Sequence, residues 1–166
     1  AMNPCRCGYF GHPTRMCTCK DTDVRKYVSR ISGPLLDRID IQIELPSLTY
    51  EEINKKGEIP ESSADVRKRV VAAREYARKR MGESSDKFSN AELDAADIRK
   101  YCITDTSADA LLRAAYDKMG MSVRGHDRIM RVARTIADLE GSEVIRANHI
   151  AEAIQYRSLD RKYWNT

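Results

Sequence analysis

Cysteine is the residue type with the clearest capacity for chemistry in this sequence, because four of its five cysteines lie within the first nineteen positions. These four form two Cys-x-Cys pairs separated by nine residues: Cys5, Cys7, Cys17 and Cys19. Thiolates are preferred zinc ligands, and the turn-forming residues of segment 8–13 can bring the pairs together. We expect a closed, structural Zn²⁺ site, in which His12 could replace one thiol. Two reduced pairs or a redox pair are the alternatives.

Arg38 is an arginine placed where a guanidinium could meet phosphate. It follows a Gly-Pro turn and a Leu-Leu pair, at the start of an expected strand over 39–45. Such a position can project the guanidinium toward a phosphate held by a neighbouring subunit, because the planar fork matches phosphate oxygens. A surface ion pair with Asp37 or Asp40, which would contribute little stability, is the simpler interpretation from the residues alone.

Arg124 is a second arginine of this kind, in the first turn of an expected helix over 123–139. The helix dipole disfavours a cation at this end, so the position makes more sense if an anion binds there. At 100° per residue, Arg124, Arg128 and Arg131 fall within an arc of about 60°. A solvated basic face is the alternative.

The spacing of apolar residues predicts a mainly helical chain, with a small α/β part of one or two strands before a helical bundle. Four apolar residues alternate with polar ones over 39–45: Ile39, Ile41, Ile43 and Leu45. Helices are expected over 22–31, from Ser62 or Ser63 to Met81, over 90–102, from Thr104 or Thr106 to Met119, over 123–139 and over 148–156, with a helical turn within 47–60 and an extended piece at 144–145. One strand cannot pair its own backbone, so residues 1–61 indicate a fragment of a larger domain. Residues 62–166 can form a helical bundle by themselves.

Length and composition set further limits. A chain of 166 residues with net charge +4 fits one domain, or one and a fragment, and permits a nucleic-acid or nucleotide partner. No apolar run approaches ~20 residues and no basic-then-apolar stretch opens the chain, so we expect no membrane partner, no secretory signal and a cytoplasmic location. The sequence contains no G-x-x-x-x-G-K-[ST] loop, so it lacks a phosphate-binding core.

Four segments resemble, in order, the magnesium-chelatase-like AAA+ ATPases, and within them the bacterial ComM/YifB branch. They are AMNPCRCGY at 1–9, SGPLLDRID at 32–40, RVARTIADL at 131–139 and HIAEAIQYR at 149–157. The resemblance runs nearly end to end, although this family usually has Pro where Arg6 stands. It implies that the chain is the C-terminal portion of a longer protein whose upstream part carries the Walker A and B motifs.

By position, the resemblance implies a role for each site residue. Asn3 matches the sensor-1 residue that orients the attacking water, and Arg38 matches the arginine finger that acts on ATP held by the neighbouring subunit. Arg124 matches the sensor-2 arginine at the start of a lid helix, and the four cysteines match a Cys-rich insertion consistent with zinc. The expected domains are a remnant of the AAA+ core over 1–61, with sensor 1, Cys loop and arginine finger, and a helical lid over 62–166.

Two functional hypotheses follow. The first is the C-terminal portion of a hexameric ATPase that uses ATP with Mg²⁺, takes no other small-molecule substrate, and drives DNA remodelling or branch migration. On this hypothesis the present chain is inactive alone, because Walker A and B are absent from it. The alternative is a stand-alone, zinc-clipped helical module that binds nucleic acid or protein through its basic helices, including the one from Val66 to Met81.

Overall fold

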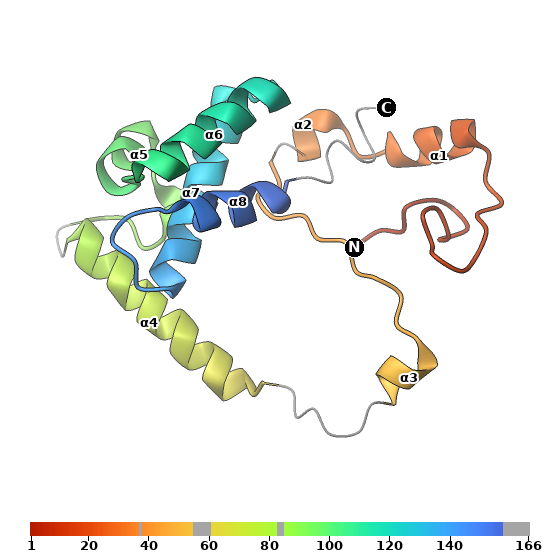
Figure 1. Ribbon diagram of the computed structural model, residues 1–166, viewed down its shortest axis with the longest axis horizontal. Coiled ribbons are helices and arrows are strands. Elements are labelled where there is room, and N and C mark those ends of the chain that lie inside the picture. Colours follow the sequence, from red (N-terminus) through yellow and green to blue (C-terminus); the bar gives the residue numbers. More distant parts are fainter. Residues whose placement is uncertain (37, 55–60, 83–84, 158–166) are drawn as a thin grey trace. The chain divides into compact units, whose positions relative to one another are not determined.

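The computed structural model describes residues 1–36, 38–54, 61–82 and 85–157 (Figure 1). The mainly helical fold is confirmed, and the chain divides into two compact units. The first comprises Ala1–Gly57 with Tyr156–Thr166, and the second comprises Glu58–Gln155. Within the described ranges, no helix has the length and apolar character needed to cross a membrane.

The first unit is built around its cysteine loop. Helix α1 (Asp21–Val28) packs Val24 and Val28 against Cys5, and these three buried residues form the core. Partly buried side chains surround that core: Cys7, Phe10, Cys17, Cys19 and Tyr27. Because four of the eight side chains are cysteines, a metal that joined them would stabilise much of this small core.

The other helices in the described part of the first unit are single turns. Helix α2 (Gly33–Leu36) has Pro34 in its first turn, where the missing N–H needs no partner, so the Ser-Gly-Pro sequence ends one helical region and begins another. Helix α3 (Tyr50–Ile53) is the turn expected within 47–60. Thr49 caps it, since the Thr49 hydroxyl accepts from the Glu52 N–H at 3.2 Å and the Glu52 carboxylate accepts from the Thr49 N–H at 2.7 Å.

The strand expected over 39–45 is not confirmed. The segment has no partner strand among the described residues, although the Gln42 N–H donates to the Tyr156 carbonyl at 2.8 Å. Its alternating apolar side chains are exposed, with fractions of 39, 54, 62 and 82% for Ile39, Ile41, Ile43 and Leu45. A strand forms only where another strand pairs its backbone and a second layer covers its apolar face. The local pattern is therefore insufficient by itself.

The second unit is a helical bundle. Its described elements are α4 (Ser63–Met81), the 3₁₀ turn η1 (Asn90–Glu92), α5 (Ala95–Tyr101), α6 (Thr106–Met119), α7 (Val123–Leu139) and α8 (Ala147–Gln155). Helix α7 packs against α4, η1, α5 and α8, and α6 packs against α8. The apolar side of α7 fills the core: Ile129, Met130, Ala133, Ile136 and Ala137. The extended piece expected at 144–145 forms an isolated parallel bridge between Thr104 and Ile145.

Most helix ends in this unit follow the expected signals. Ser62 caps α4 and Ser122 caps α7, each with its hydroxyl accepting an N–H from the first turn, at 3.2 and 3.1 Å. Gly82 follows α4, and Gly120 follows α6 with φ of 54°, a left-handed conformation that glycine adopts without strain. The cap of α6 is Asp105, which lies between the two threonines expected to start this helix.

The single helix expected over 90–102 is instead a 3₁₀ turn followed by α5. Asp94 caps α5, because its carboxylate accepts the N–H groups of Ala96 and Asp97 at 2.8 and 3.0 Å. The Asn90 side chain is 7% exposed and donates to the Asp138 carboxylate at 2.7 Å. Asn90 therefore contributes to the bundle core, and the single helix expected from residue 90 does not form.

Candidate functional site

The four cysteines of the first unit come together. Their Sγ atoms all lie within 4.8 Å of one another. Cys5 is 3.3 Å from Cys7 and 3.7 Å from Cys17, and Cys7 is 3.5 Å from Cys17. Four sulfurs around one Zn²⁺ at ~2.3 Å would be separated by about 3.8 Å, so the donor set and its spacing fit a tetrahedral zinc site.

Two tight turns fold the segment between the cysteine pairs. Gly8 has φ of +82° and its N–H donates to the Cys5 carbonyl at 3.1 Å. Gly11 has φ of +77°, and the next N–H, that of His12, donates to the Tyr9 carbonyl at 3.1 Å. A side chain at either glycine would strain this backbone, because L residues rarely adopt such φ values. The turn-forming sequence therefore gives the reversal that brings Cys17 and Cys19 back to Cys5 and Cys7.

The cysteine thiols differ in their electrostatic environments. Hydrogen bonds from the backbone N–H groups of Tyr9 and Thr18 lower the pKa of Cys7 to about 5, which favours a thiolate. The Cys19 backbone N–H acts to lower the pKa of Cys17, but burial and the neighbouring thiols outweigh it and raise that pKa to about 12. The loop thus favours a thiolate at Cys7 and disfavours one at Cys17. A bound dication would relieve this crowding.

His12 organises the loop instead of joining the sulfur cluster. Its Nδ1 accepts the backbone N–H groups of Thr14 and Arg15 at 3.2 and 3.1 Å. Its ring stands edge-on to Tyr9, with the ring centroids 5.6 Å apart. Among the described residues, the group of clustered potential ligands at this place contains only cysteines. The geometry therefore favours four thiols over a set that includes His12.

The three residues expected at a nucleotide site all lie at the surface. Asn3 is exposed, and its side chain lies beside Gly8 of the cysteine loop. Arg38 is exposed just after α2, with its N–H donating to the Leu35 carbonyl at 3.0 Å, and no described hydrogen bond or ion pair links its side chain to the cysteine loop. Asp37, a possible partner of Arg38, lies outside the described residues.

Arg124 occupies the first turn of α7, as expected. Its side chain is exposed, and no hydrogen bond or ion pair involves it within the described part of the chain. The helix start is fixed by Ser122 and by the buried Gly125, whose N–H the Ser122 hydroxyl accepts. A guanidinium at this position is free to meet an anion near the positive end of the helix.

The second unit contains a buried charged cluster that was not predicted from the sequence. Asp138 is 3% exposed and accepts from Arg134 Nε at 3.1 Å and from Arg80 at 3.0 Å. Arg134, with no exposed surface, also donates to two carbonyl oxygens between α7 and α8, at 2.8 and 2.5 Å. The i, i+4 spacing of Arg134 and Asp138 on the core side of α7 could have predicted this ion pair. It was not distinctive, because the sequence of the same helix contains several other arginines that could pair with an acid.

Comparison with known proteins gives two consecutive family matches. Residues 1–53 match the family described as magnesium chelatase, subunit ChlI, and residues 60–157 match its C-terminal family, magnesium chelatase, subunit ChlI C-terminal. Among curated relatives, the uncharacterized protein YifB of Escherichia coli is 40% identical over 162 residues, and the competence protein ComM of Haemophilus influenzae is 38% identical over 162 residues. Each alignment covers 97% of this chain and 30% of the relative.

A third relative aligns with the same share of this chain and of its own length. The YifB protein of Salmonella typhimurium is 37% identical over 161 residues, again with 97% of this chain and 30% of the relative aligned. The chain thus spans about a third of the length of these relatives. The C-terminal family match covers 60–157, more than half of the chain. The chain belongs to the magnesium chelatase ChlI family.

Proposed function

We propose that this chain is the C-terminal portion of a magnesium-chelatase-like AAA+ ATPase and completes the nucleotide site of a ring oligomer. The observation that carries the proposal is the pair of consecutive family matches, over 1–53 and 60–157, in a chain that covers 30% of relatives such as YifB. On this proposal, 1–61 is the end of the ATPase core and 62–166 is the lid. The upstream part holds ATP and Mg²⁺.

Two exposed residues of the first unit act on the nucleotide. Asn3 orients the attacking water, and Arg38 reaches the ATP held by the neighbouring subunit. A guanidinium suits this task because it stays charged and can bind two phosphate oxygens at once, which stabilises the charge that develops as the γ-phosphate leaves. The exposure of Arg38 supports this role, since a finger that acts on another subunit must project from its own.

Arg124 senses the nucleotide from the lid. Its place in the first turn of α7 combines an exposed cation with the N–H groups of a helix start, a combination suited to the phosphates of ATP. Movement of the bundle would then follow the state of the nucleotide.

Zinc would be held by Cys5, Cys7, Cys17 and Cys19 as a structural cross-link. A site with four protein ligands leaves no coordination position for substrate, so the metal supplies stability and no chemical step. Its place beside Asn3 supports a role in holding the sensor-1 segment in shape.

For the whole protein, we propose a ring hexamer that remodels DNA, including branch migration. One relative is a competence protein, and the described part of this chain offers basic helices as a partner surface. The second candidate function is a stand-alone, zinc-clipped module, favoured by the fact that all four clustered thiols come from within this chain. An in-frame phosphate loop upstream of Ala1 in the gene supports the ATPase, and a reading frame that starts here supports the module.

Arg38→Ala in the longer protein tests the arginine finger. ATP hydrolysis should be abolished while ATP binding, measured by titration with a fluorescent nucleotide, stays close to wild type. An unchanged turnover rate would remove Arg38 from this role.

Arg124→Ala tests the lid arginine separately. Hydrolysis or nucleotide-dependent closure of the lid should be impaired in the longer protein. Wild-type kinetics would return Arg124 to a solvated basic face. The 166-residue chain alone should show no ATP turnover, and measurable hydrolysis by a clean preparation would contradict the proposed division of the site.

A further inference from the structure

Helix α4 carries a straight row of three arginines: Arg67, Arg74 and Arg78. At 100° per residue they fall within an arc of about 40°, and at ~1.5 Å per residue the row is about 16 Å long. The two acidic residues of this helix, Asp65 and Glu75, lie outside that arc, at least 60° or so from its edges. The row is therefore a strip of uniform positive charge.

The arginines of the row differ from two neighbouring cations of the same helix, Lys68 and Arg69. All three are exposed, and no ion pair or hydrogen bond of their side chains occurs within the described residues. Lys68, by contrast, pairs with Asp65 at 3.1 Å, and Arg69 pairs with Glu61 at 2.5 Å. Lys68 and Arg69 are thus partly neutralised by nearby carboxylates, whereas the arginines of the row are available to an external anion.

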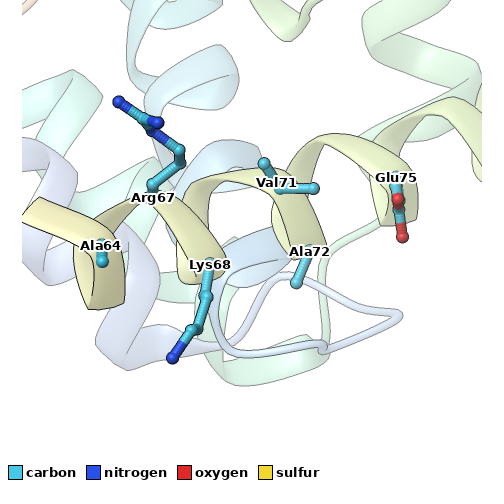
Figure 2. A pocket seen from close by; sticks show the side chains of 6 residues that line it. All are labelled: Ala64, Arg67, Lys68, Val71, Ala72 and Glu75. Atoms are coloured by element: carbon cyan, nitrogen blue, oxygen red, sulfur yellow. The ribbon is translucent and has the colours of Figure 1, made fainter.

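The surface beside Arg67, at the start of the row, is open. Figure 2 shows Arg67 and Val71 projecting from one side of α4, and Lys68 and Ala72 from another, around a shallow hollow. The far end of the helix is anchored, because Ala77 and Met81 are buried and Arg80 pairs with Asp138. The helix backbone that carries the row is thus held in place by the bundle, so binding needs to order only the arginine side chains.

We propose that this arginine row binds the sugar-phosphate backbone of duplex DNA, with one phosphate for each arginine. A line of guanidinium groups on one side of a rigid helix is complementary to a line of phosphates, and a guanidinium can bind two phosphate oxygens at once. Lysine would suffice for general attraction. The inference deepens the proposed function by assigning a DNA-contacting surface, and it rests on that function only for the choice of DNA as the polyanion.

Salt dependence of binding tests the row. Affinity of the 166-residue chain for a fluorescent 20-base-pair duplex is measured by anisotropy between 50 and 200 mM NaCl. Three phosphate contacts correspond to about −2.7 in the slope of log K against log salt, or about 40-fold in affinity over this range. The triple variant Arg67→Gln, Arg74→Gln, Arg78→Gln should lose this part of the slope. Glutamine retains helix propensity, and circular dichroism checks the fold.

A matched variant separates the row from net charge. Lys68→Gln, Arg69→Gln, Lys79→Gln removes the same three charges from the same helix but leaves the row intact, and it should keep most of the salt slope. Equal loss in the two variants, or no loss in the row variant, would overturn the proposal. So would row-dependent binding to polyglutamate with no binding to the duplex, which would make the partner an acidic protein.

Failure of this proposal is distinguishable from failure of the proposed function. ATP hydrolysis by the longer protein without DNA should be unchanged in the row variant, because the row is outside the nucleotide machinery. A longer protein that hydrolyses ATP normally while its row makes no difference to DNA binding would overturn the DNA surface alone.

Discussion

Asp138 is the residue on which the charge balance of the second unit depends. It is 3% exposed and accepts from Arg80, Asn90 and Arg134. Burial lowers the pKa of Arg134, and the adjacent Asp138 carboxylate opposes this effect. One carboxylate thus faces two guanidinium groups, so its loss would leave buried positive charge without compensation.

Asp138→Asn should therefore destabilise the bundle by about 3 kcal/mol, because removing one partner of a buried ion pair is costly. Urea unfolding followed by circular dichroism measures this. Asp109→Asn is the control: Asp109 is 60% exposed and lies 3.7 Å from Arg113, so its loss should cost less than about 0.5 kcal/mol. Similar losses of unfolding free energy in the two variants would show that the buried cluster stabilises the bundle no more than an exposed ion pair does.

A second prediction at the residue scale concerns zinc binding by the four clustered cysteines. Protein purified without chelator should hold about one zinc per chain. Cys5→Ser should reduce the zinc content to less than half and destabilise α1, because Cys5 is both a ligand and the centre of the small core. Cys102→Ser is the control, since Cys102 lies buried in the second unit and burial raises its pKa to about 11. Less than half a zinc in the wild-type chain, with four reactive thiols, would contradict the site.

Sequence reasoning found the cysteines but not the charged cluster, for a physical reason. Metal ligands must be of a few types at close spacing, and Cys5, Cys7, Cys17 and Cys19 satisfy that within one short segment. Asn90 and Asp138 meet only because α7 packs on η1, across 48 residues of sequence. Asn90 has the local signature of a helix cap, and the tertiary contact overrides it.

At the scale of elements, the sequence pattern predicted the capped helices correctly but also predicted a strand over 39–45 that is not confirmed. Ser62, Ser122, Gly82 and Gly120 mark helix ends through hydrogen bonds and backbone conformations that a few neighbouring residues determine. Segment 39–45 would form a strand only with a partner strand, and the described residues supply none. Its alternation of apolar and polar side chains is therefore compatible with a strand but does not produce one.

Segment 39–45 should gain protection in the longer protein. If the upstream core supplies a partner strand, the amides of Ile41 and Ile43 should exchange with deuterium at least tenfold more slowly there than in the 166-residue chain, since paired amides exchange only after opening. Hydrogen exchange with mass spectrometry on both proteins measures this, with the amides of α7 as an internal reference. Equally fast exchange in both would show that the exposed isoleucines serve another purpose.

At the scale of the whole molecule, the chain has two units of different kinds. The second, Glu58–Gln155, has a continuous apolar core centred on α7. The first has a core of three buried residues and leaves four alternating apolar side chains of 39–45 exposed. Such a division accords with the proposal that residues 1–61 belong to an ATPase core and residues 62–166 to a lid.

The most direct test of the ATPase proposal is a mixing experiment with the longer protein. One variant carries Arg38→Ala and the other lacks the lysine of the upstream phosphate loop, and each alone should be inactive. If Arg38 acts on the ATP of a neighbouring subunit, a co-assembled equal mixture should regain hydrolysis at about a quarter of its interfaces. A mixture that co-assembles yet stays as inactive as its components, or an Arg38→Ala protein with wild-type turnover, would contradict the account.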